Sequence, residues 1–294
     1  MPPIPPPRTS GFTAQTALPL YWCRYTSPAP SGSLVLLHGG PGAHHDYMLP
    51  QMLELAKSHD LLLYDQRGGG HSKTEDRTPI TWRTHVEDLA ALLGELHEGP
   101  LTLVGYSWGA MLAMLYATEA AAGRVAPAPV RLVLIAPAPL TRSWRAEFEA
   151  EFSKRQNGEA VSAMRAELQA SGLRERDPEA YKQRAFELSV AGYFADPSRS
   201  RDLTPFRVTG RVQQSVWESL GDFDLIPALE ALRIPAFVAH GQDDPIPLHS
   251  AQGCAAALGA EGLWLDDCGH VPYVEQPELL FAAIEEFLAR TQAS

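Results

Sequence analysis

Residues 101–122 read LTLVGYSWGAMLAMLYATEAAA, and this stretch carries the strongest structural signal in the chain. The apolar run LTLVGY (101–106) predicts a buried strand, and the Ala-rich run from 110 predicts a helix. Between them stands Gly-Tyr-Ser-Trp-Gly (105–109), a G-x-S-x-G sequence in the strand-to-helix context where a serine is held in a strained turn. We therefore expect Ser107 to be a nucleophile, placed at a helix N-terminus whose dipole favours developing negative charge.

A nucleophilic serine needs a base and an acid that orients the base, and the expected order along this kind of chain is serine, acid, histidine. The apolar run IPAFVAH (234–240) leads into Gly-Gln-Asp-Asp-Pro (241–245), so carboxylates stand just past the end of a predicted strand. Both Asp243 and Asp244 meet this description. We favour Asp244, because an acid three residues after the glycine and before a proline turn has the usual spacing. Asp243 stays as the alternative.

The base is expected near the C-terminus. His270 stands in Asp-Cys-Gly-His-Val-Pro (267–272), after the short run LWLDD (263–267) and before a predicted helix. The chain has ten histidines, but His270 alone combines the right order, the loop context and the Gly-His pair. We expect its imidazole to reach across to Ser107.

An oxyanion formed at the nucleophile needs main-chain N–H donors, one from the residue after the serine and one from a loop after an early strand. The loop His-Gly-Gly-Pro-Gly (38–42) follows the apolar run LVLL and fits the second requirement. Its glycines let a main-chain amide approach a substrate oxygen. The sequence therefore predicts an oxyanion hole formed by the amides of Gly40 and Trp108.

Short apolar runs alternate with helical patterns around this centre. Runs of this length and composition predict strands buried on both faces, hence a mostly parallel, doubly wound α/β sheet. The expected strands are 34–38, 60–65, 101–106, 131–136 and 234–240, with a possible antiparallel edge strand at 18–26. The expected helices of this body are 86–96, 110–122 and 277–290.

Charge density divides the chain into domains. Residues 141–224 carry 13 basic and 14 acidic side chains, far more per residue than the flanking segments. Helical patterns at 144–156, 160–170 and 177–194 indicate that this segment is an inserted helical cap. The expected organisation is a flexible Pro-rich tail (1–10), a core domain (11–140 and 225–294) and a cap domain (141–224).

Composition excludes several classes of function. The chain has 294 residues and a net charge of −11, which argues against binding nucleic acid or anionic membranes. No transmembrane run or secretory signal is evident. Three cysteines without a CxxC pair favour a reducing, cytoplasmic location. The sequence leaves the oligomeric state open.

Two further segments invite ligand hypotheses that we reject. DQRGGGHS (65–72) lacks the spacing of a nucleotide-binding loop, and we expect a rigid turn in which Asp65 and Arg67 pair with each other. His44-His45-Asp46 lacks a partner cluster, and adjacent side chains rarely converge on one ion. We predict neither a metal nor a cofactor.

Together these motifs resemble the α/β-hydrolase superfamily and, within it, the prolyl aminopeptidase (proline iminopeptidase) family. The resemblance rests on HGGPG (38–42) with HDY (45–47), DQRGGGHS (65–72), GYSWG (105–109), GQDDP (241–245) and CGH (268–270). It implies an α/β-hydrolase fold with a helical cap after the sixth strand, where the charge-rich insertion lies. It also implies a serine hydrolase that needs no cofactor.

Family members hold the free α-amine of a peptide with cap carboxylates, since a buried ammonium needs an anionic partner. One branch has a glutamate three residues before a Tyr-Phe pair. Here Tyr193-Phe194 is present, but the matching position is Val190. Glu218, after Trp217, and Glu187 are the remaining candidates for the amine.

The resemblance implies an aminopeptidase that releases N-terminal proline, or another small or apolar residue, from short peptides. Ser107 would form an acyl-enzyme, with His270 as base and Asp244 as its orienter. The departure in the cap keeps a second hypothesis open, a carboxylesterase or C–C bond hydrolase that acts on small molecules with the same triad.

Overall fold

A computed structural model of the chain describes residues 3–291. Its centre is one eight-stranded sheet with the order β1-β2-β4-β3-β5-β6-β7-β8. The strands from β4 to β8 in this order pair in parallel, whereas β2 runs antiparallel to both β1 and β4. The strands are β1 (Thr9–Phe12), β2 (Tyr21–Tyr25), β3 (Ser33–Leu37), β4 (Asp60–Tyr64), β5 (Leu101–Tyr106), β6 (Pro129–Ile135), β7 (Ala236–Gly241) and β8 (Glu261–Leu265).

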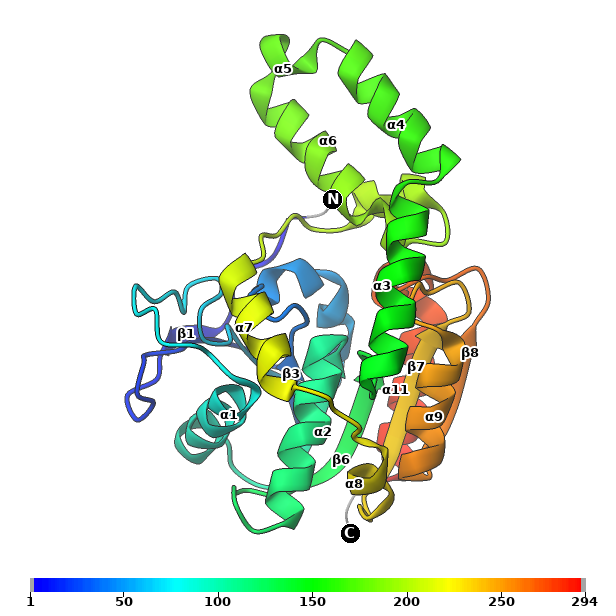
Figure 1. Cartoon of the computed structure of the whole chain (residues 1–294). Coiled ribbons are helices and arrows are strands. Elements are labelled where there is room, and N and C mark those ends of the chain that lie inside the picture. Colours follow the sequence, from blue (N-terminus) through cyan, green and yellow to red (C-terminus); the bar gives the residue numbers. More distant parts are fainter. Residues whose placement is uncertain (1–2, 292–294) are drawn as a thin grey trace.

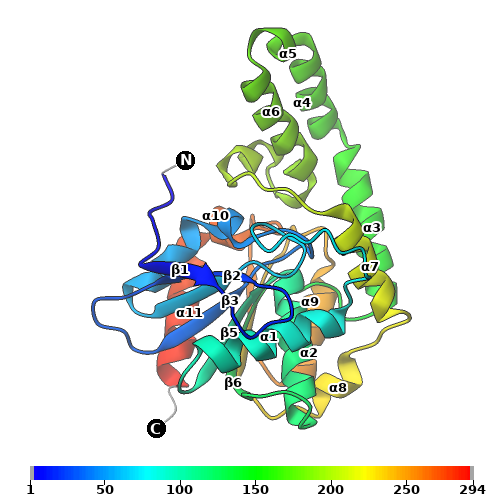
Figure 2. The same ribbon diagram turned by 90° about the vertical axis from the view of Figure 1, so that its left-hand side faces the viewer.

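Helices cover both faces of this sheet, which explains why its parallel strands are continuous apolar runs. On one face, Val35 and Leu37 belong to a core that includes α1 (Trp82–Leu96), α2 (Trp108–Ala121) and α9 (Leu248–Leu258). On the other, Leu34 and Leu36 belong to a core with α11 (Pro277–Arg290) and the 3-10 helices η1 (His45–Met48) and η2 (Gln51–Lys57). Figure 2 shows α11 on one side of the sheet and α1 and α2 on the other. The doubly wound sheet expected from the sequence is confirmed.

The N-terminal segment differs from expectation in two respects. Thr9 and Ser10, expected in the flexible tail, are strand residues of β1. β2 falls within 18–26 and is antiparallel, but it is not an edge strand, because β1 pairs with its outer side. This pairing satisfies main-chain groups that an edge strand would leave open. Residues 1–2 and 292–294, at the ends of the expected tail and core ranges, lie outside the described residues.

The charge-rich insertion follows β6 and is helical, as expected. Thr141 and Asp224 form an isolated antiparallel bridge at its base. Helices α4, α5 and α6, here called the arm, extend away from the sheet, while α3 and α7 lie closer to it (Figure 1). The elements are α3 (Arg142–Gln156), α4 (Glu159–Ala170), α5 (Leu173–Arg176), α6 (Pro178–Val190), η3 (Ala191–Tyr193), η4 (Pro197–Asp202) and α7 (Gly210–Leu220).

Two short helices complete the chain, α8 (Ile226–Glu230) before β7 and α10 (Pro272–Glu275) before α11. No helix among residues 3–291 combines the length and the apolar character needed to cross a membrane.

Candidate active site

Ser107 occupies the sharp turn between β5 and α2. Its backbone has φ 54° and ψ −118°, a strained conformation for a residue with a side chain. The two flanking glycines permit the turn. A Cβ on Gly109 would lie 1.9 Å from the carbonyl oxygen of Leu37, and one on Gly105 would lie 2.4 Å from the carbonyl oxygen of Gly109. The G-x-S-x-G pattern is thus required by close backbone packing at this turn.

His270 connects Ser107 to an aspartate. Its Nε2 lies 3.0 Å from Ser107 Oγ, and its Nδ1 lies 2.8 Å from Asp244 Oδ2. The Asp244 carboxylate is buried and also accepts the main-chain N–H of Ile246 at 2.7 Å. Asp243 is exposed, and its main-chain N–H donates to the carbonyl oxygen of Cys268. The structure therefore brings Asp244, and not Asp243, to His270.

The glycine loop after β3 lies directly against Ser107. A Cβ on Gly39 would lie 3.1 Å from Ser107 Cβ, and Gly40 lines the same pocket as Ser107 with a φ of 129° that favours glycine. Trp108 is the first residue of α2, where main-chain N–H groups lack an intrahelical acceptor. Both amides expected for an oxyanion hole therefore lie next to Ser107.

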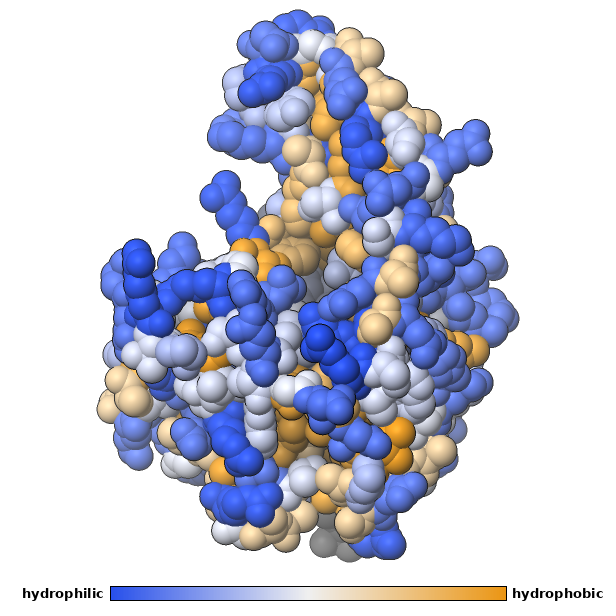
Figure 3. Space-filling view, viewed as in Figure 1, coloured by the Kyte–Doolittle hydropathy of each residue, from blue (hydrophilic) through white to orange (hydrophobic). Residues whose placement is uncertain are grey.

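A pocket of about 430 Å³ opens over these groups, with Gly40, Ser107 and His270 in its lining. In Figure 3 the surface is hollowed beneath the arm, and apolar side chains gather around the hollow. Of the described residues that line the pocket, none is Asp or Glu. Its wall is mainly apolar or aromatic. The core contributes Tyr47, Tyr106 and Val271, and the cap contributes Phe152, Phe186, Val190, Tyr193, Leu203, Phe206 and Val208.

The two glutamates expected to bind an amine do not line this pocket. Glu187 is buried on α6, where its carboxylate accepts hydrogen bonds from Arg184 and from Gln183 at 3.1 Å. Glu218 lies on α7 and accepts from Gln214 at 2.7 Å, beside a separate surface groove. Val190 does line the pocket, so the position where one family branch carries a glutamate holds an apolar side chain.

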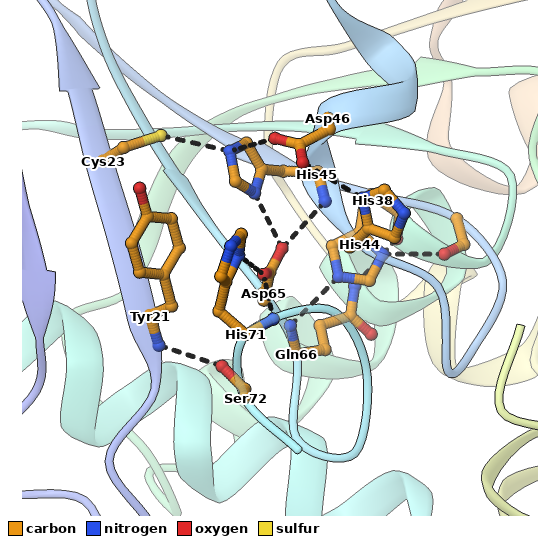
Figure 4. Close-up of polar contacts among 11 residues, drawn as sticks. Tyr21, Cys23, His38, His44, His45, Asp46, Asp65, Gln66, His71 and Ser72 are labelled. Carbon is orange, nitrogen blue, oxygen red and sulfur yellow. Dashed lines mark hydrogen bonds and ion pairs between the residues drawn. The ribbon is translucent and has the colours of Figure 1, made fainter. Parts of the chain in front are cut away.

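The loop after β4 supports the glycine loop through a buried polar network (Figure 4). The Asp65 carboxylate accepts from the main-chain N–H of His45 at 2.9 Å, from its Nδ1 at 2.7 Å and from the main-chain N–H of His71 at 2.8 Å. Burial alone would raise the pKa of Asp65, but the hydrogen bonds from His45 hold that pKa well below its usual range. Burial would likewise lower the pKa of His45, but its bonds to Asp46 and Asp65 raise it well above 6.5.

The expected pairing of Asp65 with Arg67 is wrong. Arg67 donates to Asp88 of α1 at 2.7 Å, while Asp65 bonds to His45 of η1. The two side chains therefore bind to helices on opposite faces of the sheet. Within residues 3–291, no group of three or more His, Cys, Asp or Glu side chains is arranged to hold a metal ion.

Two residues that were not among the expected site residues support the site. Glu275 accepts the main-chain N–H groups of Gly269 at 3.0 Å and Val271 at 3.2 Å, the two neighbours of His270. Gln66 joins the nucleophile turn to the glycine loop. Gln66 lies in the DQRGGGHS motif, whereas no motif marked Glu275.

Comparison with known proteins assigns the family. The model of the alpha/beta hydrolase family matches residues 34–283. The chain belongs to the alpha/beta hydrolase family. Among relatives of this chain, a proline iminopeptidase of Lactobacillus helveticus is 27% identical over 271 residues, covering 87% of this chain and 89% of that protein.

Solved structures share the hydrolase fold at lower identity. The proline iminopeptidase of Mycobacterium smegmatis superposes with a TM-score of 0.70 at 21% identity, covering 96% of this chain and 98% of that one. An enol-lactonase of Burkholderia xenovorans superposes with a TM-score of 0.65 at 21% identity, covering 95% and 100%. These similarities show that the chain has the fold of this family.

Proposed function

We propose that this alpha/beta hydrolase is a serine hydrolase that works through an acyl-enzyme. Ser107 Oγ attacks the substrate carbonyl while His270 Nε2, 3.0 Å away, takes its proton and then passes it to the leaving group. Asp244 orients the imidazole and stabilises its positive charge. The amides of Gly40 and Trp108 donate to the oxyanion, and a water molecule then releases the acyl group by the same steps.

The acyl group of the substrate is small, apolar and uncharged, as in a carboxylic ester or a lactone. The observation that carries this proposal is the composition of the pocket, whose described lining includes aromatic and aliphatic side chains but neither Asp nor Glu. An α-ammonium group placed there would lose its hydration without gaining an anionic partner, which is unfavourable. An uncharged acyl group gains from the apolar wall without that cost.

A second candidate is an aminopeptidase that releases N-terminal proline. It is supported by the proline iminopeptidase of Lactobacillus helveticus, a relative that matches most of the chain. The aromatic wall also suits a pyrrolidine ring. This activity would require the ammonium to bind groups other than the two expected glutamates.

The test compares two p-nitroanilides that differ in one atom, those of proline and of cyclopentanecarboxylic acid, together with the p-nitrophenyl ester of the latter. Ser107→Ala protein is the control for every substrate. We expect Ser107-dependent cleavage of the ester and, between the anilides, a preference for the carbocycle. A faster cleavage of the prolyl anilide would favour the aminopeptidase instead.

A further inference from the structure

Gln66 is the point where three separate motifs of the chain meet. It follows β4 by two residues and is fully buried. Its side-chain Nε2 donates to the carbonyl oxygen of His38 at 2.7 Å, and its Oε1 accepts the indole N–H of Trp108 at 2.8 Å. The side chain therefore bridges the glycine loop after β3 and the nucleophile turn after β5.

The bridge continues through the ring of His38 to the glycine loop. The main-chain N–H of Gln66 donates to His38 Nε2 at 3.0 Å, and the other ring nitrogen, Nδ1, lies 2.7 Å from the carbonyl oxygen of Gly39. Burial lowers the pKa of His38 to about 4, so the ring is neutral at physiological pH and has one donor and one acceptor. Nε2 accepts from Gln66, and Nδ1–H donates to Gly39.

These bonds form one chain from Trp108 through Gln66 and His38 to Gly39. Its first member carries one of the two amides assigned to the oxyanion hole, and its last member precedes Gly40, which carries the other. A hydrogen-bonded path thus spans the separation between the two donors. Oxyanion stabilisation depends on that separation, because the donors must be held in place before charge develops.

The loop that carries Gln66 is itself held by hydrogen bonds and close backbone packing. The neighbouring Asp65 receives the bonds from His45 and His71 described above, and Figure 4 shows this network beside the contact between Gln66 and His38. A Cβ on Gly69 would lie 1.8 Å from the carbonyl oxygen of Ala43, so the two loops are packed backbone to backbone. The loop that carries Gln66 is therefore in direct backbone contact with the residue that follows the glycine loop.

We propose that Gln66 is a positioning residue of the oxyanion hole, which fixes the amides of Gly40 and Trp108 relative to each other through its bonds to His38 and to the Trp108 indole. This inference rests on the proposed serine hydrolase mechanism. It also gives a physical reason why the three motifs occur together in this chain.

Two variants interrupt this bridge, one at its central residue and one at its Trp108 end. Gln66→Met keeps the length of the side chain but removes both of its hydrogen bonds, and Trp108→Phe removes the indole N–H while keeping the main-chain amide. Tyr116→Phe is the matched control, since it removes a partly buried hydrogen bond, from Tyr116 Oη to the carbonyl oxygen of Pro127, farther along the same helix α2.

Three quantities are measured for each variant: kcat and KM on the p-nitrophenyl ester, the inhibition constant of a trifluoromethyl ketone that forms a tetrahedral adduct, and the rate of labelling by a fluorophosphonate. We expect Gln66→Met to lower kcat by about 10- to 100-fold with KM changed less than about threefold. Ketone affinity and labelling rate should fall by similar factors. Tyr116→Phe should leave all three within about twofold.

The double variant tests whether both residues act through one bridge. If they do, Gln66→Met with Trp108→Phe should be little worse than the more damaged single variant. Multiplying effects, a change in KM alone, or a Gln66→Met protein with unimpaired ketone affinity would overturn the inference. If Gln66→Met does not fold, Trp108→Phe decides by the same criteria.

The labelling experiment separates this inference from the proposed function. A wild-type protein that does not react with the fluorophosphonate, or a Ser107→Ala protein that is labelled equally, would overturn the serine hydrolase mechanism. A reactive wild type with an equally reactive Gln66→Met variant would overturn the role of Gln66 alone.

Discussion

The ring of Tyr193 stacks on the imidazole of His270, with ring centroids 5.1 Å apart and planes inclined by 30°. The carbonyl oxygen of Tyr193 also accepts the main-chain N–H of His270 at 2.7 Å. Tyr193 belongs to the cap and His270 to the loop after β8. The cap therefore covers the pocket and also fixes the position of the proposed catalytic base, His270.

Glu275 connects the cap to the loop that carries His270. Its replacement should make the position of the His270 imidazole less well fixed. It accepts Ala195 N–H of the cap at 2.9 Å, besides the N–H groups on both sides of His270. In Glu275→Gln one acceptor oxygen becomes a donor that faces another donor, at a cost of about 1–3 kcal/mol. We expect kcat to fall by about tenfold and the melting temperature to fall. The exposed Glu278→Gln is the control, and an unchanged kcat in Glu275→Gln would contradict this role.

The two adjacent aspartates should differ sharply in their effect on activity. Asp244→Asn removes the charge beside His270 Nδ1, and loss of the equivalent orienting carboxylate in a catalytic triad lowers kcat by about 10⁴-fold. Asp243→Asn changes only an exposed side chain and should leave kcat within about twofold. Steady-state kinetics on the ester distinguish the two, and equal losses would show that the acid is wrongly assigned.

Val190 offers a gain-of-function test of the substrate class. Val190→Glu places a carboxylate in the wall of the pocket, where it can pair with an α-ammonium group. A charge-assisted hydrogen bond contributes about 1.5–3 kcal/mol, so cleavage of prolyl p-nitroanilide relative to the carbocyclic anilide should rise by about tenfold or more. Val190→Gln has the same shape without the charge and should show no such rise. If the two variants show the same preference between the anilides, a carboxylate at position 190 is not what the pocket lacks for binding an α-ammonium group.

Acid stability should depend on His85, a fully buried histidine of α1 whose ring meets that of Trp108 edge to face. Burial lowers the pKa of His85 to about 3, so the folded protein keeps the ring neutral while the unfolded chain takes up a proton below about pH 6.5. The unfolded state then binds more protons, and stability falls as the pH drops from about 6.5 to 3, by up to about 1.4 kcal/mol per pH unit.

His85→Leu should remove this contribution and flatten the acid side of the stability curve. Urea denaturation at a series of pH values measures it. The exposed His249→Leu should retain the wild-type slope. A wild-type slope in His85→Leu as well would mean that His85 does not carry the effect.

Local sequence patterns were sufficient to predict the bounds of some helices and strands. β5 and α11 have the bounds expected from apolar runs and from the proline that begins the last helix. Ser107, Asp244 and His270 could be proposed from the sequence because each stands in a short motif after a strand, and the structure brings them within hydrogen-bond distance. The edge position expected for 18–26 was wrong, because it depended on whether another strand pairs beside it.

The supporting residues escaped prediction for a similar reason. Gln66 is 28 residues from His38 and 42 from Trp108, and Glu275 is 80 residues from Ala195. Contacts over such separations leave no periodic signal in a single sequence.

The amino-acid sequence alone was enough to predict the buried parallel strands and the strained turn at Ser107, since these follow from local composition and backbone sterics. The contact of Asp244 with His270, favoured by the sequence over one from Asp243, and the presence of Val190 rather than Glu187 or Glu218 in the pocket wall are visible only in the folded chain. Which side chains face a shared cavity depends on how segments distant in the sequence pack over one another. Hydrophobic burial drives that packing, and because it is non-directional, a local sequence pattern does not show which segments will meet.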